Sequence, residues 1–106
     1  MAIHIQTPIL ASRALSLGTG KDVRLKMEAL QPSGSFKTRG IGHACETYKA
    51  RGARRFISSS GGNAGYAVAY AGRMLATPVT VVVPATTSER ARHLIQSEGA
   101  QVIVHG

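Results

Sequence analysis

A chain of 106 residues is long enough for one small hydrophobic core and too short for two domains of ordinary size. Its hydrophobic content of 43% is ordinary for a globular protein, no segment offers the run of about 18 apolar residues that a membrane span needs, and a single cysteine excludes an internal disulfide. Thirteen basic and five acidic residues give a net charge of +8, which suits either nucleic-acid binding or a site for small anions.

Further features of the composition narrow the expected partners and compartment. The N-terminus lacks the basic and apolar regions of a secretory signal, and lone Cys45 fits a reducing compartment, so we expect a cytoplasmic protein. The basic residues are spread along the chain, and three Tyr, two Phe and no Trp stack poorly on single strands. We expect no nucleic-acid or membrane partner, and a non-catalytic basic nucleic-acid-binding module remains the alternative from a different class.

The first third of the chain predicts short elements. Residues 1–10 are expected to form an extended lead-in, and residues 12–17 a short helix that is stopped by Gly18-Thr19-Gly20. Apolar and charged residues alternate over 23–28, which is the period of a half-buried strand.

From residue 35 on, helical and strand patterns alternate. Ser35 is the expected N-cap of a helix over 35–50, in which apolar residues recur at helical spacing, namely Phe36, Ile41, Ala44, Cys45 and Tyr48. Further elements are expected as a strand at 55–58, a helix at 63–75, a β-branched strand at 79–83 covered on both faces, a helix at 89–98 and a strand at 101–104. This order predicts an α/β fold, an open parallel sheet of βαβ units.

Lys37 falls in the first turn of the helix predicted over 35–50. Acidic residues usually occupy that turn, because it lies at the positive end of the helix dipole. A cation is mildly destabilised there, so the setting favours loss of the lysine proton. It suits a lysine that acts as an amine nucleophile, for example in a Schiff base. The alternative is an exposed surface lysine on an ordinary helix.

A second unusual segment is Ser58-Ser59-Ser60-Gly61-Gly62-Asn63-Ala64-Gly65, between a predicted strand and a predicted helix. Ligands of open parallel sheets bind at such strand ends, and free N–H groups at a helix start attract anions. Eight small or polar residues exceed the needs of a plain Gly-rich turn, which is the alternative interpretation. We therefore predict an anion site there.

Known glycine motifs narrow the choice of anion. The segment does not match a dinucleotide-binding fingerprint, because Ser60 stands at the first glycine position. It does not match a P-loop either, because no Gly-Lys-Ser or Gly-Lys-Thr follows the glycines. A small carboxylate or a lone phosphate remains. No metal site is predicted, since the four histidines are scattered and no pair lies at ligand spacing with an acid.

Together, two segments resemble the fold-type II pyridoxal-phosphate enzymes. They are Gln-Pro-Ser-Gly-Ser-Phe-Lys-Thr-Arg-Gly-Ile-Gly-His at 31–43 and Ser-Ser-Gly-Gly-Asn-Ala-Gly at 59–65. The resemblance extends over essentially the whole chain, including Thr7-Pro8 and Leu25-Lys26-Met27-Glu28. Within the family it is greatest to the L-serine dehydratases.

This resemblance implies a role for each matching residue. Lys37 would hold pyridoxal 5'-phosphate through a Schiff base and move protons at the substrate Cα, and Phe36 would pack against the pyridine ring. The loop that grips the substrate carboxylate would consist of Ser60, Gly61, Asn63 and Ala64, and Asn63 would also bond the phenolic oxygen of the cofactor. The implied reaction is α,β-elimination of water from L-serine, with L-threonine as an alternative substrate, to pyruvate or 2-oxobutanoate and ammonia.

The same resemblance implies that the chain is an N-terminal fragment. Residues 1–34 would begin the large cofactor-binding domain, and residues 35–106 would form most of the small α/β domain. The phosphate-binding loop and the partner of the pyridine nitrogen would follow later, so we expect the fragment alone to be inactive and the full-length protein to be a homodimer. Gly61 stands where relatives often carry Ala or Ser, which is expected to affect how the substrate is held.

Other members of the family remain alternatives: threonine dehydratase, serine racemase and cysteine-synthase-like enzymes. Ile-Gly-His at 41–43 favours serine dehydratase over the first two. Cysteine synthases typically follow the lysine with an acid, where this chain carries Thr38-Arg39. A remnant that keeps the fold without activity is a further alternative.

Overall fold

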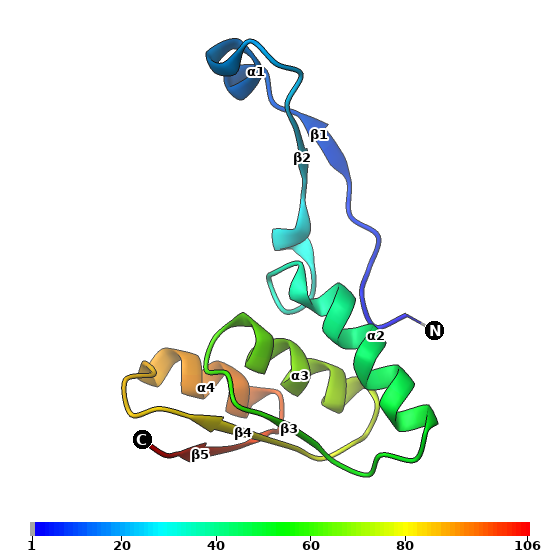
Figure 1. Ribbon diagram of the computed structural model, residues 1–106, viewed down its shortest axis with the longest axis vertical. Coiled ribbons are helices and arrows are strands. Elements are labelled where there is room, and N and C mark those ends of the chain that lie inside the picture. The colour runs from blue at the N-terminus through cyan, green and yellow to red at the C-terminus, as the bar shows by residue number, and fades with distance from the viewer. Residues whose placement is uncertain (1) are drawn as a thin grey trace.

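The computed structural model describes residues 2–106, which form an extended N-terminal arm and a sheet with helices packed on it (Figure 1). The arm, residues 9–26, consists of strand β1 (Ile9–Ala11), helix α1 (Arg13–Thr19) and strand β2 (Arg24–Lys26), and the short 3-10 helix η1 (Glu28–Leu30) follows it. Three helices and three strands then alternate: α2 (Lys37–Ala50), β3 (Phe56–Ser58), α3 (Asn63–Met74), β4 (Val79–Val83), α4 (Glu89–Ser97) and β5 (Gln101–Val104).

The arm is an antiparallel strand pair that encloses a capped helix. Strands β1 and β2 pair with Leu10 opposite Leu25. The Ser12 hydroxyl accepts the N–H of Leu15 at the start of α1. The helix continues two residues further than predicted, through Gly18 and Thr19, and Gly20 at φ +69° ends it. A strand does form within the predicted range 23–28, but all three of its residues are exposed, so the expected half-burial is wrong. Among the elements of the described chain, β2 contacts chiefly its paired strand β1. The alternation of apolar and charged residues does not reveal whether another segment covers the apolar face of a strand.

Strands β3, β4 and β5 form one parallel sheet in that order, which confirms the predicted α/β fold of βαβ units. Helix α3 packs on β3 and β4, α4 packs on β5, and α2 lies along α3 (Figure 1). Small residues allow these close approaches. A Cβ on Gly72 of α3 would lie 2.1 Å from Cγ2 of Val79.

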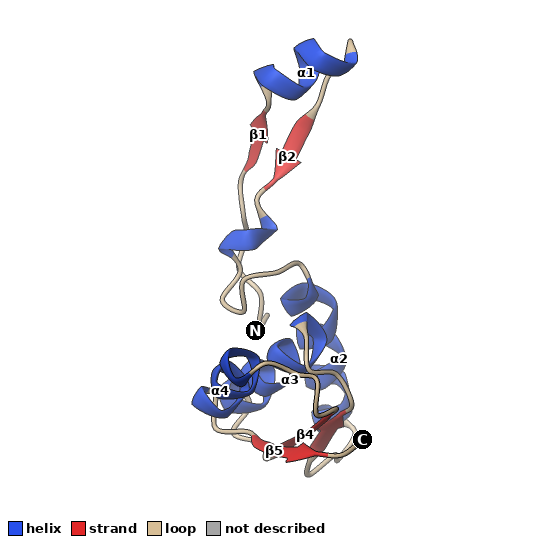
Figure 2. Cartoon of the chain, turned by 90° about the vertical axis from the view of Figure 1, so that its left-hand side faces the viewer, coloured by secondary structure: helices blue, strands red, loops and turns tan. Residues whose placement is uncertain are grey.

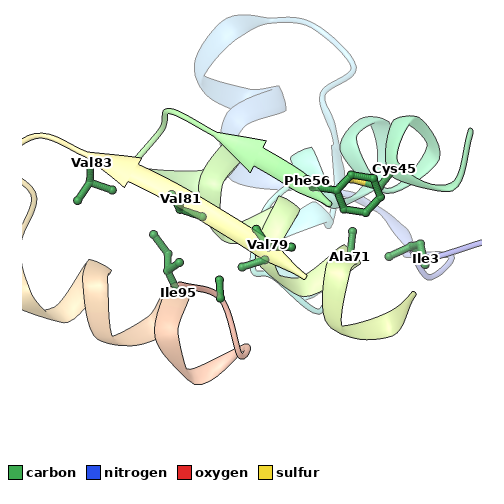
Figure 3. Packing of buried hydrophobic residues seen from close by; sticks show 10 residues of the cluster. Ile3, Cys45, Phe56, Ala71, Val79, Val81, Val83 and Ile95 are labelled. Carbon is green, nitrogen blue, oxygen red and sulfur yellow. The ribbon is translucent and has the colours of Figure 1, made fainter. Parts of the chain in front are cut away.

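The core lies between the sheet and α3 and α4. Alternate residues of β4 point into it, namely Val79, Val81 and Val83, and Ile95 of α4 packs against them (Figure 3). At the other end of the cluster, Phe56 lies near Cys45 of α2 (Figure 3). Ile3 is the single residue before α2 that belongs to this cluster.

The expectation that residues 79–83 are covered on both faces is confirmed, because four of the five residues of β4 are buried and Val82 is partly buried. Within residues 2–106, helices lie on one face of the sheet only (Figure 2). On the other face Ile57 is 72% exposed, whereas Thr80 is buried. Arg55 Nη1 donates to the Thr80 hydroxyl, which donates to Gln101 Oε1. A β-branched run has the same sequence pattern whether helices or neighbouring side chains cover its second face.

Helix α2 begins at Lys37, two residues later than predicted, and its N-cap is Phe36 instead of Ser35. The Ser35 hydroxyl nevertheless accepts the N–H of Lys37 at 3.3 Å. The preceding turn is held by short-range bonds, from Thr38 N–H to Ser35 C=O and from Arg39 N–H to Phe36 C=O, which is a 3-10 pattern. Lys37 therefore does lie in the first turn of α2.

Replacing Ile95 by alanine should lower the free energy of unfolding by about 3 kcal/mol, because the side chain is 1% exposed and its loss leaves a cavity. The matched control is Ile103→Ala on β5, where the side chain is 42% exposed and the loss should be about 1 kcal/mol or less. Urea denaturation of both variants measures the difference, and equal losses would contradict this packing.

No helix among residues 2–106 has the length and hydropathy that crossing a membrane requires.

Candidate active site

The two segments that the sequence analysis singled out meet at one cavity. Its volume is about 260 Å³, and its lining comes from the start of α2 and the start of α3, namely Phe36, Lys37, Gly40, Ile41 and Ala64. The segments are brought together because α2 and α3 pack side by side. A Cβ on Gly40 would meet no atom within 4 Å, so the cavity is open beside this residue.

Lys37 is half-buried at this cavity, and its amine is free. Within residues 2–106 its Nζ has no hydrogen-bond or ion-pair partner, whereas the amines of Lys26 and Lys49 donate to the carbonyl oxygens of Thr7 and Leu75. A primary amine without a partner is available for nucleophilic attack on a carbonyl group.

Phe36 is the aromatic residue at this site. Its ring is 63% exposed, so it does not serve the core in the described chain. An exposed aromatic ring beside a reactive amine offers a flat apolar surface for a planar ligand.

The loop between β3 and α3 has the features of an anion site. Side-chain oxygens already accept two of its N–H groups, Ser58 Oγ from Ser60 and Ser60 Oγ from Gly62. In the first turn of α3, the N–H groups of Asn63 and Ala64 have no acceptor in the described part of the chain. Such groups at the positive end of a helix bind carboxylates and phosphates.

Not all of the predicted site residues line the Lys37 cavity. Gly61 and Asn63 line a second, smaller cavity of about 80 Å³ between the starts of α3 and α4, where Ile95 forms part of the wall. Ala64 is therefore the loop residue that shares a cavity with Lys37, and the substrate-carboxylate roles of Ser60, Gly61 and Asn63 remain predictions.

Two glycines of the loop lie in close contact with other segments, and at Gly65 the contact is with backbone. A Cβ on Gly65 would lie 1.8 Å from the carbonyl oxygen of Ser60, so only glycine lets α3 start this close to the end of β3. A Cβ on Gly61 would lie 2.6 Å from Oγ1 of Thr87, in the loop after β4. Sequence reasoning missed Thr87, although loops that follow neighbouring parallel strands meet at the same sheet edge.

A polar network next to Lys37 was also missed from the sequence. The Glu28 carboxylate accepts three hydrogen bonds, from Arg39 Nε at 2.7 Å, from Gln31 Nε2 at 2.8 Å and from the Thr7 hydroxyl at 2.7 Å. The Arg39 guanidinium above all, and then the amide and the hydroxyl, hold the pKa of Glu28 at about 2, below its ordinary 4.5.

This network makes the stability of the chain depend on pH. A carboxyl whose pKa is lower in the folded state stabilises the fold above its unfolded value of 4.5, and the contribution is lost as the pH falls through about 2. Glu28→Gln should therefore be less stable than the wild type at neutral pH. The difference should shrink from about pH 4.5 downwards and vanish below about pH 2, and thermal melts across that range measure it. A difference that does not change with pH would contradict this assignment.

Comparisons with known proteins identify the same family that the two sequence segments resemble. A family model described as "Pyridoxal-phosphate dependent enzyme" matches residues 2–106. The human protein "L-serine dehydratase/L-threonine deaminase" is 51% identical over 104 residues, which are 98% of this chain and 32% of that protein. The human "Serine dehydratase-like" protein is 52% identical over 103 residues, 97% of this chain and 31% of its own length.

A solved structure gives the same result at the level of the fold. The fungal L-serine ammonia-lyase from Rhizomucor miehei superposes with a TM-score of 0.88 and 39% identity, over 100% of this chain and 34% of that one. The chain spans about a third of the length of the curated relatives that it matches.

Proposed function

Since this chain belongs to the family of pyridoxal-phosphate dependent enzymes, we propose that it forms part of a lyase that eliminates water from L-serine, with L-threonine as a second substrate. The products would be pyruvate or 2-oxobutanoate, and ammonia. The observation that supports the proposal is a cavity lined by Lys37, Phe36 and Ala64, together with the absence of a partner for the Lys37 amine in the described chain. The names of the most similar relatives support the choice of reaction.

The residues at the cavity fit pyridoxal phosphate, the cofactor of this family. A free lysine amine can bind its aldehyde carbon, an exposed phenylalanine ring can pack on its pyridine ring, and open space lies beside Gly40. The cavity is smaller than the roughly 300–1,000 Å³ of most ligand pockets, so it would hold part of the cofactor. Lys37, Phe36 and Asn63 are the proposed holding residues. When bound, the cofactor supplies an electron sink for the substrate carbanion.

The residues of this chain would contribute binding, orientation and proton transfer. Lys37 Nζ would take the proton from the substrate Cα as a general base. The free N–H groups of Asn63 and Ala64 would bind the substrate carboxylate at the positive end of α3, which orients the Cα proton toward the lysine. The Cβ–O bond would then break, and the hydroxyl would leave as water with the proton that Lys37 took from Cα. The released enamine would take up water and lose ammonia, which gives the 2-oxo acid.

A binding experiment tests the proposed reaction, because turnover is proposed for the whole protein and this chain spans a third of its relatives. The chain is loaded with pyridoxal phosphate and its visible spectrum is recorded with L-serine, L-threonine, D-serine and L-alanine. We expect L-serine to change the spectrum at the lowest concentration. Asn63→Ala should weaken that response, because it removes the side-chain amide that is proposed to bond the phenolic oxygen of the cofactor. A response to O-acetyl-L-serine without one to L-serine would favour a cysteine-synthase-like enzyme instead.

We also propose that residues 1–34 begin a large cofactor-binding domain and that residues 35–106 form most of a small α/β domain. The support is the uneven burial of the chain. The arm, residues 9–26, contributes no buried residue, and of residues 2–34 only Ile3 joins the apolar cluster that the parallel sheet and its helices hold. An arm of this kind needs another surface to cover Leu10 and Leu17, which are 50% and 69% exposed.

For the whole protein we propose a cytoplasmic homodimer. The resemblance to fold-type II enzymes supports the dimer, and the lone cysteine supports a reducing compartment. Sedimentation of the whole protein measures its oligomeric state, and fractionation of cells measures its compartment.

A further inference from the structure

Lys37 lies at the start of α2. The two residues that follow it, Thr38 and Arg39, make side-chain hydrogen bonds to the segment before the helix. The hydroxyl of Thr38 shares a hydrogen bond with that of Ser33, and both residues are buried. Arg39 Nε donates to Glu28 Oε1 at 2.7 Å, in an ion pair whose side chains are 40% and 15% exposed. The backbone on the C-terminal side of Lys37 is therefore held by two different anchors.

Glu28 extends these ties to the first residues of the chain. Its second carboxylate oxygen accepts from Thr7 and from Gln31. Gln31 is 3% exposed, and its side-chain amide bonds both ways with the backbone of Ile5, accepting from N–H at 2.9 Å and donating to C=O at 2.8 Å. One carboxylate thus joins residues 5–7 and 31 to helix α2.

Apolar packing contributes little to holding the segment before α2 against that helix, so the polar network is its main attachment. Among the residues before α2, only Ile3 belongs to the buried hydrophobic cluster, and η1 contains no buried residue. Nη2 of Arg39 is buried without a partner in the described chain, so the contact at Nε carries the interaction. Charge-assisted hydrogen bonds are directional, and their loss leaves buried polar groups unsatisfied.

We infer that Arg39, anchored by Glu28, is a positioning residue that fixes the first turn of α2 and thereby holds the amine of Lys37 at the cavity beside Ala64. The inference rests on the proposed function, in which Lys37 holds the cofactor. Neither residue lines that cavity, so both act through Lys37.

The test uses a matched ion pair elsewhere in the chain. Arg73 Nε donates to Glu98 at 2.6 Å, with side chains 53% and 13% exposed, at the end of α3 far along the chain from Lys37. Arg39→Ala, Glu28→Ala and the control Arg73→Ala are compared by hydrogen exchange, thermal melts and capture of pyridoxal phosphate on Lys37 by borohydride reduction. Glu28→Gln is a milder variant in case an alanine variant does not fold.

We expect Arg39→Ala and both Glu28 variants to speed amide exchange at residues 37–40 by about tenfold and to reduce capture on Lys37 by a similar factor. Arg73→Ala should lower the melting temperature without either effect. The double variant Arg39→Ala/Glu28→Ala should change amide exchange and capture no more than the single variant with the larger effect, because the two residues act as one unit.

Two outcomes separate this inference from the proposed function. Unchanged exchange at residues 37–40 in Arg39→Ala, or equally fast exchange there in Arg73→Ala, would overturn the positioning role alone. Failure of both the wild-type chain and the whole protein to capture the cofactor on Lys37 would overturn the proposed role of that lysine, and the inference with it.

Discussion

Replacing Lys37 by alanine is expected to abolish covalent capture of pyridoxal phosphate and to leave the fold intact. The amine of Lys37 has no hydrogen-bond or ion-pair partner in residues 2–106, so its loss should change the free energy of unfolding by less than about 0.5 kcal/mol. The loss of capture should be complete, because no other lysine lines the cavity. The cofactor absorbance that remains with the protein after gel filtration measures capture, and a thermal melt measures stability.

Lys21→Ala is the matched control for this prediction. Lys21 is exposed in the turn between α1 and β2, far along the chain from the cavity, so its removal should leave capture unchanged. Equal capture by Lys37→Ala and Lys21→Ala would show that pyridoxal phosphate attaches to lysines without selection.

Replacing Gly65 by alanine is expected to destabilise the chain by about 3 kcal/mol or more. The added Cβ would lie 1.8 Å from the carbonyl oxygen of Ser60 and 3.1 Å from Cγ1 of Val81. Since the first of these atoms belongs to the backbone, rotation of a side chain cannot relieve the overlap. The end of β3 and the start of α3 must move apart, which also separates the free N–H groups of α3 from the loop. Urea denaturation measures the loss.

The matched control is Gly18→Ala in helix α1, where a Cβ would meet no atom within 4 Å. Alanine there should stabilise the chain by about 0.5–1 kcal/mol, because glycine is a poor residue inside a helix. If both substitutions changed stability by the same amount, the close approach at Gly65 would be wrong.

The alternating elements of the sheet could be predicted from the sequence because their signals are local. Ser88 caps α4 because its hydroxyl oxygen accepts from Ala91 N–H three residues on, and Gly99, at φ +87°, follows the helix end. The β-branched run of β4 likewise identifies its strand without reference to any other segment. Each of these features lies within a few residues of its cause.

Contacts between distant segments could not be predicted in the same way. Glu28 meets Arg39 and Thr7, and Gly61 meets Thr87, at separations that no periodic pattern encodes. The pairing of β1 with β2 was missed for a similar reason, since Pro8 and a short apolar run predict only an extended segment. The start of α2 was misplaced because Phe36 has helical backbone angles without being part of the α-helix.

The candidate site was predictable to the extent that residue types carry chemistry. A lysine in the first turn of a helix and a small, polar loop before another helix are unusual in themselves, and the structure brings Lys37 and Ala64 to one cavity. The sequence could not tell that Gly61 and Asn63 line a separate cavity against α4, because that depends on how α3 is rotated about its axis.

One measurement tests the central claim most directly. The chain is incubated with pyridoxal phosphate, reduced with borohydride and digested, and the modified lysines are identified by mass spectrometry. The account predicts that Lys37 carries at least about ten times more pyridoxyl group than Lys21, Lys26 or Lys49, because it alone combines a free amine with a cavity. An even distribution over the four lysines would contradict it.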